Sequence, residues 1–214
     1  MKQMFLYGVG GIGCELADYF SEREYDIVFI DDNEAITEMY GFPVYTFEKA
    51  VNMFPLKEAG VTVTIGEPVI RERLTNRLKE YEIPEKTLDV GLYHSKRMVV
   101  IGDGSIIHFG SILTVRTTLG HSCLINKGAV IGHDCTIGDH CVLSPNVTVG
   151  GSVVIGNGTF VGSGAVIRNN IEIGQNVIIG MGAVITKSVR DNAVVVGNPG
   201  KEIRENTSRR VFGN

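Results

Sequence analysis

The chain of 214 residues lacks several features that would assign it to common classes of protein. Its formal net charge is −4, so a broad basic surface for nucleic acid is not expected. No apolar run approaches the roughly 20 residues that span a membrane. The opening stretch, MKQMFLYGVG, lacks the layout of a secretory signal. These absences predict a cytoplasmic protein that binds neither nucleic acid nor membrane.

Cysteine is scarce as well, with four residues in the whole chain. No CxxC pair and no cluster of cysteine with histidine is present, so the sequence gives no indication of a zinc site. We therefore expect no metal.

The feature that organises the chain is a period of six residues between Ile101 and Ile185. Every sixth position in this range is Ile, Leu or Val, without an insertion. The residue four places after each aliphatic is small or β-branched, and glycine often follows the aliphatic directly. A period of six fits neither an α-helix nor a simple strand, and it indicates a hexapeptide β-helix.

Each hexad predicts one short strand and a corner, so three hexads make a triangular coil of 18 residues and the fifteen hexads make about five coils. The aliphatic column is expected to fill the interior, and glycine to relieve the backbone at tight corners. Cys123 and Cys141 are 18 residues apart and would stack on successive coils. A bridge between them is conceivable, but a reducing cytoplasm favours free thiols.

Residues 1–90 follow a different pattern, that of a small α/β Rossmann-like domain. A strand at Met4–Tyr7 leads into the glycine turn Gly8-Val9-Gly10-Gly11-Ile12-Gly13 and a helix. A second strand ends in Asp31 and Asp32. The turn would direct helix amides at a phosphate, and the acids would accept hydrogen bonds from a ribose or base. The alternative is a tight turn that binds nothing.

A charged helix from about Pro68 to Tyr81 follows a third strand and Gly66. Its arginines and lysine are expected mostly on solvated faces. Arg71 is the one that we single out as a candidate ligand.

Residues 91–190 form the predicted β-helix domain, with its first coil starting at Met98–Ile101. Residues 191–214 form a C-terminal cap, in which 193–199 predicts a strand and turn. Lys201–Arg210 predicts a short charged helix or tail that covers the open end of the coils.

Histidines in the middle coils are the candidates for catalysis. His133 should point outward near a corner, with Asp134 beside it and Gly151 stacked above it, as suits a general base. The alternative is a surface residue or a contact between subunits. His121 stacks with Asp139, and His121, His133 and His140 do not converge on a metal within one subunit.

Several segments carry a resemblance to a known family. The segment Asn126–Asp139 (NKGAVIGHDCTIGD), followed by Ser144-Pro145-Asn146 and Gly150-Gly151, resembles bacterial sugar O-/N-acetyltransferases of the NeuD type. These include enzymes that acetylate nucleotide-linked 4-amino sugars. The glycine turn, Asp31-Asp32, and the closing VGNPGK at 196–201 are similar to the same family.

The resemblance implies a left-handed β-helix, a trimer with active sites between subunits, acetyl-CoA in the cleft, and a nucleotide sugar on the N-terminal domain. It makes His133 the base and Asp134 its orienting acid. It places Asn126 near the sugar, and the Gly151 amide at the thioester oxygen. The implied substrate-binding set is Gly10, Gly11, Asp31, Asp32, Gly66, Arg71 and Asn126. The implied cofactor-binding set is Gly151, Gly180, Ala183, Lys187, Pro199 and Lys201.

Two positions depart from the family pattern. Ile12 stands where many members have a histidine in the glycine turn, and Val142 stands where many have a second histidine near the thioester. The departures put one contact to the nucleotide phosphate and one polarising group in doubt.

The function that the resemblance implies is N-acetylation of a nucleotide-linked 4-amino-4,6-dideoxy sugar in bacterial surface glycan biosynthesis. O-acetylation of a free sugar such as sialic acid is the alternative within enzymes. A non-catalytic module that binds a sugar nucleotide or CoA is the alternative outside them. A dinucleotide-dependent oxidoreductase is disfavoured because only one βαβαβ half is present. The sequence leaves open the nucleotide, the sugar and the acyl length.

Overall fold

The computed structural model describes residues 2–95 and 97–212, and the chain divides into two compact units. One unit comprises the residues up to Gly66 together with Arg73–Lys86, and the other comprises Glu67–Glu72 and the residues from Thr87 onward. The division after Lys86 falls a few residues before the expected boundary at 90. Residues 1, 213 and 214, which belong to the expected terminal segments, lie outside the described residues.

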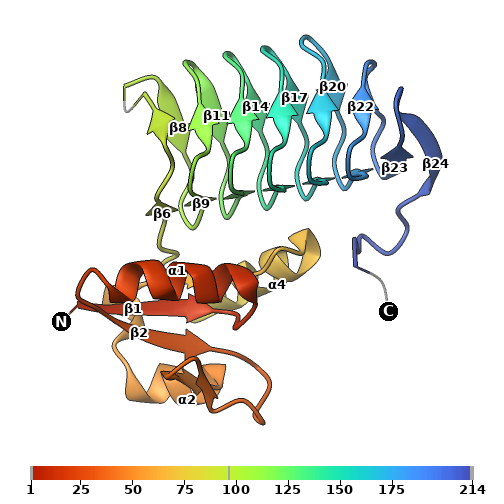
Figure 1. The fold of residues 1–214 in the computed structure, drawn as a ribbon. Coiled ribbons are helices and arrows are strands. Elements are labelled where there is room, and N and C mark those ends of the chain that lie inside the picture. The colour runs from red at the N-terminus through yellow and green to blue at the C-terminus, as the bar shows by residue number, and fades with distance from the viewer. Residues whose placement is uncertain (1, 96, 213–214) are drawn as a thin grey trace. The chain divides into compact units, whose positions relative to one another are not determined.

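The first unit is a sheet with the strand order β3-β4-β2-β1-β5. Neighbouring strands are parallel except for β3 and β4. Helix α1 lies against one face and α2 against the other (Figure 1). The βαβαβ order is as expected, and the β3–β4 hairpin at the edge is an addition. The elements are β1 (Lys2–Tyr7), α1 (Gly11–Ser21), β2 (Tyr25–Ile30), β3 (Glu38–Met39), β4 (Phe42–Tyr45), α2 (Phe47–Met53), α3 (Leu56–Ala59) and β5 (Val61–Val63). Helix α4 (Pro68–Glu80) also contributes to this unit, from Arg73 onward.

The second unit is a left-handed parallel β-helix, as the hexads and the family resemblance predicted, and its coils stand in a row in Figure 1. Its strands pair across coils, most of them with the strand 18 residues away. The first sheet contains β6 (Leu88–Asp89), β9 (Ile106–Ile107), β12 (Leu124–Ile125), β15 (Val142–Leu143), β18 (Phe160–Val161), β21 (Ile178–Ile179), β23 (Ala193–Val196) and β24 (Lys201–Glu205). The second sheet contains β7 (Tyr93–His94), β10 (Ile112–Leu113), β13 (Val130–Ile131), β16 (Thr148–Val149), β19 (Val166–Ile167) and β22 (Val184–Ile185). The third sheet contains β8 (Val99–Ile101), β11 (Thr117–Leu119), β14 (Thr136–Ile137), β17 (Val154–Ile155) and β20 (Glu172–Ile173).

The hexad columns form the core of this unit. The aliphatic column from Ile107 to Ile185 is buried, and the small column joins it in one cluster. Cys123, Cys135 and Cys141 belong to that cluster, and they are free thiols. Burial raises the pKa of the Cys123 thiol to about 11, which keeps it protonated and unreactive.

The left-handed backbone of the corners lies at other positions than the glycines that were expected to relieve it. Every sixth residue from Gly104 to Gly182, three places after the aliphatic, has a positive φ. Only some of these residues are glycines. The others are Arg116, Ser122, Asp134, His140, Asn146, Ser152, Asn170 and Asn176.

The glycines that directly follow the aliphatic residues are required for a different reason. A Cβ on Gly132 would lie 2.6 Å from the backbone nitrogen of Gly151, and one on Gly162 would lie 2.6 Å from that of Met181. These glycines therefore permit the close approach of successive coils; they do not supply a left-handed conformation.

Both ends of the β-helix differ from expectation. The first strands are β6 and β7, so the coils begin about ten residues before Met98. Strand β23 lies within the predicted strand and turn, but Lys201–Glu205 is the antiparallel strand β24 and not a helix. Strand β24 forms backbone hydrogen bonds with β23, which would otherwise be an unpaired edge of the first sheet. This pairing explains why the charged stretch Lys201–Glu205 is extended.

Substitution of Gly162 by alanine tests the close approach of the coils. We expect Gly162→Ala to lower the free energy of unfolding by about 1–3 kcal/mol, because the new methyl group contacts rigid backbone. The control is Gly164→Asn, since Gly164 has φ +69° with open space around its Cβ position and asparagine tolerates this conformation. Urea denaturation of both variants measures the effect, and equal stability of the two would contradict it.

Candidate functional site

The candidate base, His133, lies at the corner that follows β13, between the second and third sheets. Its side chain is 61% exposed. Gly132 lets the coil turn closely over the next one, and Asp134 takes the positive φ of +60° at the corner. The corner geometry therefore places the imidazole and the carboxylate side by side on the outside of the β-helix.

His133 and Asp134 form a hydrogen-bonded pair. The distance between His133 Nδ1 and Asp134 Oδ2 is 2.6 Å. Hydrogen bonds from Arg116 and then from His133 lower the pKa of the Asp134 carboxyl to about 2, so it is an ionised acceptor near neutral pH. Nδ1 of the neutral imidazole is therefore assigned the hydrogen, which leaves the Nε2 lone pair free to accept a proton.

Arg116 also belongs to this site, although it was not among the residues predicted from the sequence. Its Nε donates to Asp134 Oδ1 at 2.6 Å, and a terminal nitrogen donates to Oδ2 at 2.9 Å. Arg116 precedes Asp134 by 18 residues, which is the spacing of stacked positions. The 18-residue rule that paired His121 with Asp139 could have found it.

Gly151 lies against the imidazole, as its stacked position predicted. A Cβ on Gly151 would be 2.7 Å from both Nε2 and Cε1 of His133, so a side chain there would displace the ring. Among the described residues, none accepts a hydrogen bond from the Gly151 N–H. The imidazole, its free nitrogen and a backbone donor therefore meet at one corner.

Asn126 and Val142 lie elsewhere on the β-helix. Asn126 is 9% exposed, and its side-chain oxygen accepts the Lys127 N–H at 2.8 Å within the turn after β12. Val142 lies on β15 in the first sheet and is 2% exposed. The structure therefore does not show Asn126 or Val142 beside His133.

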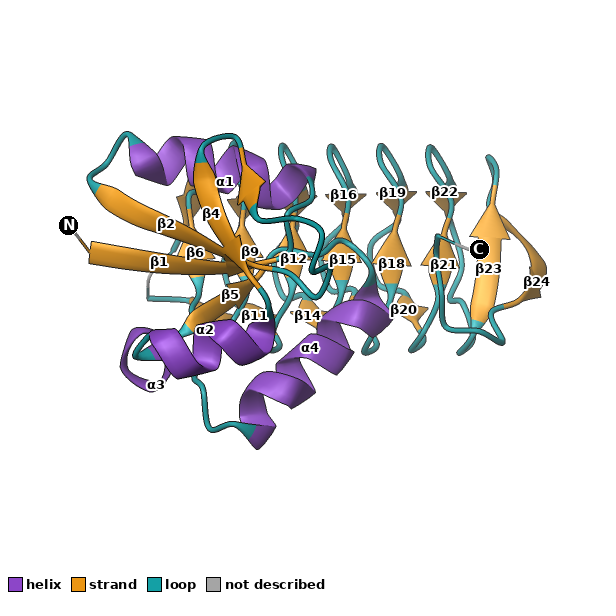
Figure 2. Cartoon of the chain, turned by 90° about the horizontal axis from the view of Figure 1, so that it is seen from below, coloured by secondary structure: helices purple, strands orange, loops and turns teal. Residues whose placement is uncertain are grey.

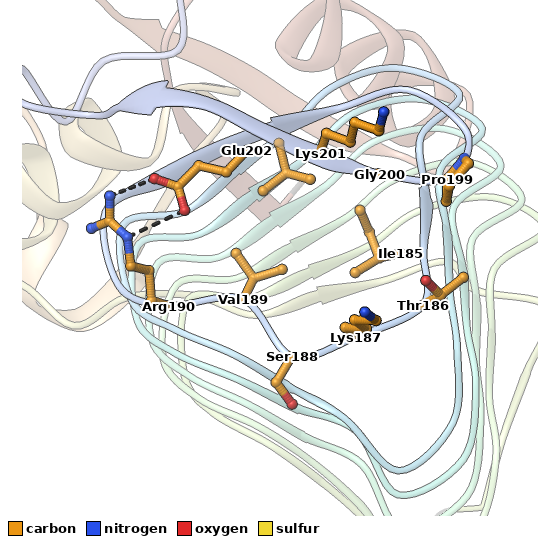
Figure 3. A pocket seen from close by; sticks show the side chains of 11 residues that line it. Ile185, Thr186, Lys187, Ser188, Val189, Arg190, Pro199, Gly200, Lys201 and Glu202 are labelled. Carbon is orange, nitrogen blue, oxygen red and sulfur yellow. Dashed lines mark hydrogen bonds and ion pairs between the residues drawn. The ribbon is translucent and has the colours of Figure 1, made fainter.

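Three residues of the predicted cofactor-binding set line one hollow of about 510 Å³ near the C-terminal end of the β-helix. Lys187, Pro199 and Lys201 contribute to its wall, and Arg190 forms an ion pair with Glu202 at its side (Figure 3). The remaining members are placed differently: Ala183 is fully buried in the core, and a Cβ on Gly180 would meet Val196 at 2.8 Å.

In the first unit, the glycine turn leads into α1 with open space around it. A Cβ on Gly10 or Gly11 would meet nothing within 4 Å. A Cβ on Gly66 would meet only the tip of Ile12, at 3.4 Å. Asp31 Oδ2 accepts the Val9 N–H at 3.3 Å, which ties the end of β2 to the turn. The predicted turn and Asp31 therefore do meet. The carboxyl ends of β1 and β2, which precede them, lie side by side (Figure 2).

Asp32 belongs to a polar cluster with Tyr7 and Arg77. Its Oδ1 accepts the Tyr7 hydroxyl at 2.8 Å and Arg77 at 2.9 Å. Arg77 also pairs with Glu48 and lies over the Phe47 ring at 4.1 Å. Burial, followed by the Asp32 carboxylate, raises the pKa of Tyr7 well above its usual value. Arg77 was expected on a solvated face, but it orients Asp32.

Arg71 also differs from expectation, because its side chain is fully buried. Its Nε donates to the Ser122 carbonyl at 2.7 Å. We therefore interpret Arg71 as a residue that anchors the Glu67–Glu72 segment to the β-helix, and we do not assign it to the nucleotide.

The other middle histidines do not form a second site. The backbone N–H of His121 donates to Asp139 Oδ1 at 2.8 Å, and burial lowers the pKa of His140. No three His, Cys, Asp or Glu side chains in the described part of the chain are arranged to hold a metal ion. Within the same residues, none of the helices has the length and apolar character of a membrane span.

Two family models match separate parts of the chain. The PglD N-terminal domain matches residues 3–78, and the bacterial transferase hexapeptide model, which describes six repeats, matches residues 116–151 and 152–187. A search among curated proteins found no match.

Solved structures are similar over nearly the whole chain. WeeI from Acinetobacter baumannii is 29% identical, with a TM-score of 0.79 and coverage of 94% of this chain and 100% of that one. The acetyltransferase domain of PglB from Neisseria gonorrhoeae is 26% identical, with a TM-score of 0.82 and coverage of 95% and 100%. PerB from Caulobacter crescentus, solved with CoA and GDP-perosamine, is 25% identical, with a TM-score of 0.82 and coverage of 94% and 97%.

The hexapeptide model covers the segment that contains His133, and the PglD model covers most of the first unit. The chain therefore belongs to the hexapeptide-repeat transferases that carry a PglD-type N-terminal domain, the NeuD-type sugar acetyltransferases, and it is an acyltransferase.

Proposed function

We propose that the protein transfers an acetyl group from acetyl-CoA to the amine of a nucleotide-linked 4-amino-4,6-dideoxy sugar, in bacterial surface glycan biosynthesis. The observation that carries the proposal is the corner at which the free Nε2 of His133 lies against Gly151. The presence of CoA and GDP-perosamine in the similar PerB structure supports both substrate classes.

The chemistry follows from these groups. The sugar amine attacks the thioester carbon while Nε2 of His133 accepts a proton from the nitrogen. The Gly151 N–H donates to the oxygen on which negative charge develops. Collapse of the tetrahedral intermediate breaks the carbon–sulfur bond, and the proton held by His133 passes to the departing CoA thiolate. Amines attack thioesters readily, so positioning contributes much of the acceleration.

The proposed binding sites follow the two units. The hollow lined by Lys187, Pro199 and Lys201 suits the anionic CoA arm, because two lysines border an apolar wall. The nucleotide would bind at the open N-terminus of α1, with Asp31 and Asp32 as acceptors.

A homotrimer is part of the proposal. Several apolar side chains on the outer surface of the β-helix are 40% or more exposed in the single chain, among them Val100, Val154 and Val166. Packing of neighbouring subunits through this surface would exclude water from His133, which a single chain leaves open.

Removal of the base is the first test. We expect His133→Ala to lower kcat by about 10²–10⁴-fold and to leave CoA binding nearly unchanged. Release of the CoA thiol with amino-sugar nucleotides measures turnover. His121→Ala serves as the matched control because it removes an exposed imidazole from a different corner. Near-wild-type turnover of His133→Ala would remove His133 from the mechanism.

The nucleotide site gives a second prediction. We expect Asp31→Asn and Asp32→Asn each to raise the KM for the sugar nucleotide about tenfold, which corresponds to one charge-assisted hydrogen bond. The KM for acetyl-CoA should not change. Asp26→Asn, on the same strand β2 but at its other end, is the control.

A thermal-shift screen with UDP-, dTDP- and GDP-sugars in the presence of CoA identifies the nucleotide first, since bound ligand raises the unfolding midpoint. An unchanged KM in both aspartate variants would favour the O-acetylation of a free sugar instead.

A further inference from the structure

Arg116 is a charged residue from a neighbouring coil that binds the Asp134 carboxylate directly. The preceding coil supplies Arg116, and the following coil supplies Gly151 and Ser152, which carry no charge. Both carboxylate oxygens accept from its guanidinium, and one of them, Oδ2, also faces His133 Nδ1. The three side chains therefore form one chain of hydrogen bonds that ends at the free Nε2.

This arrangement contributes little to folding. The side chains of Arg116 and His133 are both more than half exposed, and that of Asp134 is more than a third exposed. Ion pairs with such exposure are screened by water and change stability little. Arg116 also takes a positive φ of +54°, a conformation that favours glycine and asparagine. An arginine at this corner therefore needs an explanation other than stability.

The geometry supplies that explanation. The terminal torsion of an aspartate is soft and roughly two-fold, so an exposed carboxylate beside an imidazole does not by itself keep one oxygen on Nδ1. A guanidinium that binds both oxygens in a fork fixes this torsion. The positive charge of Arg116 also offsets the negative charge of the Asp134 carboxylate.

We propose that Arg116 is a positioning residue for acetyl transfer: it fixes the Asp134 carboxylate so that His133 carries its hydrogen on Nδ1 and presents Nε2 to the substrate amine. The inference rests on the proposed role of His133 as the base. Arg116 acts through Asp134 and His133, so we expect its loss to change kcat and not substrate binding.

The test compares Arg116→Gln with Arg116→Lys and with a control in the same stack of corners. We expect Arg116→Gln to lower kcat about tenfold, which is less than the loss from removing the base. The KM for acetyl-CoA and the unfolding midpoint should stay within about twofold and about 2 °C of wild type. Arg116→Lys keeps the charge without the fork and should recover only part of kcat. Asn170→Gln, 54 residues further at the same kind of corner with φ +58°, should behave as wild type.

The pH profile separates positioning from a merely structural role. Without the guanidinium, the carboxylate stabilises the protonated imidazole more strongly. The acidic limb of kcat/KM therefore moves to higher pH in Arg116→Gln. Nitrogen NMR at alkaline pH should show the His133 hydrogen on Nδ1 in the wild type, and less of this tautomer in Arg116→Gln.

A wild-type kcat and pH profile in Arg116→Gln would overturn the inference, as would a wild-type His133 that carries its hydrogen on Nε2. His133→Ala, measured in parallel, separates the two proposals. If His133→Ala is impaired while Arg116→Gln is normal, only the role of Arg116 fails. If His133→Ala turns over normally, the proposed base fails and the inference fails with it.

Discussion

The hydrogen-bonded stacking of coils at an interval of 18 residues is the constraint on which the second unit depends. Parallel strands pair in this register along all three sheets, from β9 with β12 to β19 with β22. Between Val99 and Ile185, paired strand residues 18 apart therefore lie one above the other, about 4.8 Å apart. This spacing is shorter than most side chains are long. An outward corner residue must therefore pack against the residue stacked on it, form a hydrogen bond with it, or lack a side chain.

The catalytic corner uses each of these solutions. Gly132 has no side chain because the Gly151 backbone lies beneath it, and Gly151 has none because the imidazole of His133 lies against it. Arg116 and Asp134 bond to each other across the same interval. A structural repeat thus becomes a chemical site where three neighbouring coils place a cation, an acid–imidazole pair and a bare backbone amide in one stack.

The first unit prepares its acids in a different way. Asp31 is held by the backbone of the glycine turn, and Asp32 is held by Tyr7 and Arg77. Both acids are therefore oriented before any ligand arrives, which reduces the entropy that binding must remove. The orienting residues come from β1 and α4, elements that are distant in sequence from the acids. In the sequence, Arg77 is one charged residue among several on its helix. It becomes a specific partner of Asp32 only when α4 lies beside β1 and β2.

The sequence by itself determined the fold class, because an uninterrupted six-residue aliphatic column fits neither an α-helix nor a simple strand and indicates a hexapeptide β-helix. It also determined that His133, Asp134 and Gly151 lie together, since adjacency and the 18-residue interval fix their distances. The tertiary structure decided the rest: the earlier start of the coils at β6, the strand β24 in place of a helix, the burial of Arg71 and the role of Arg77. The 18-residue interval stacks Arg116 on Asp134, but the fork between them is seen only in the folded chain. These features depend on long, flexible side chains and on pairing at the ends of the repeat, where no period constrains the chain. A periodic pattern specifies backbone positions, but the direction in which an arginine extends is set by the partners that only the folded chain brings within reach.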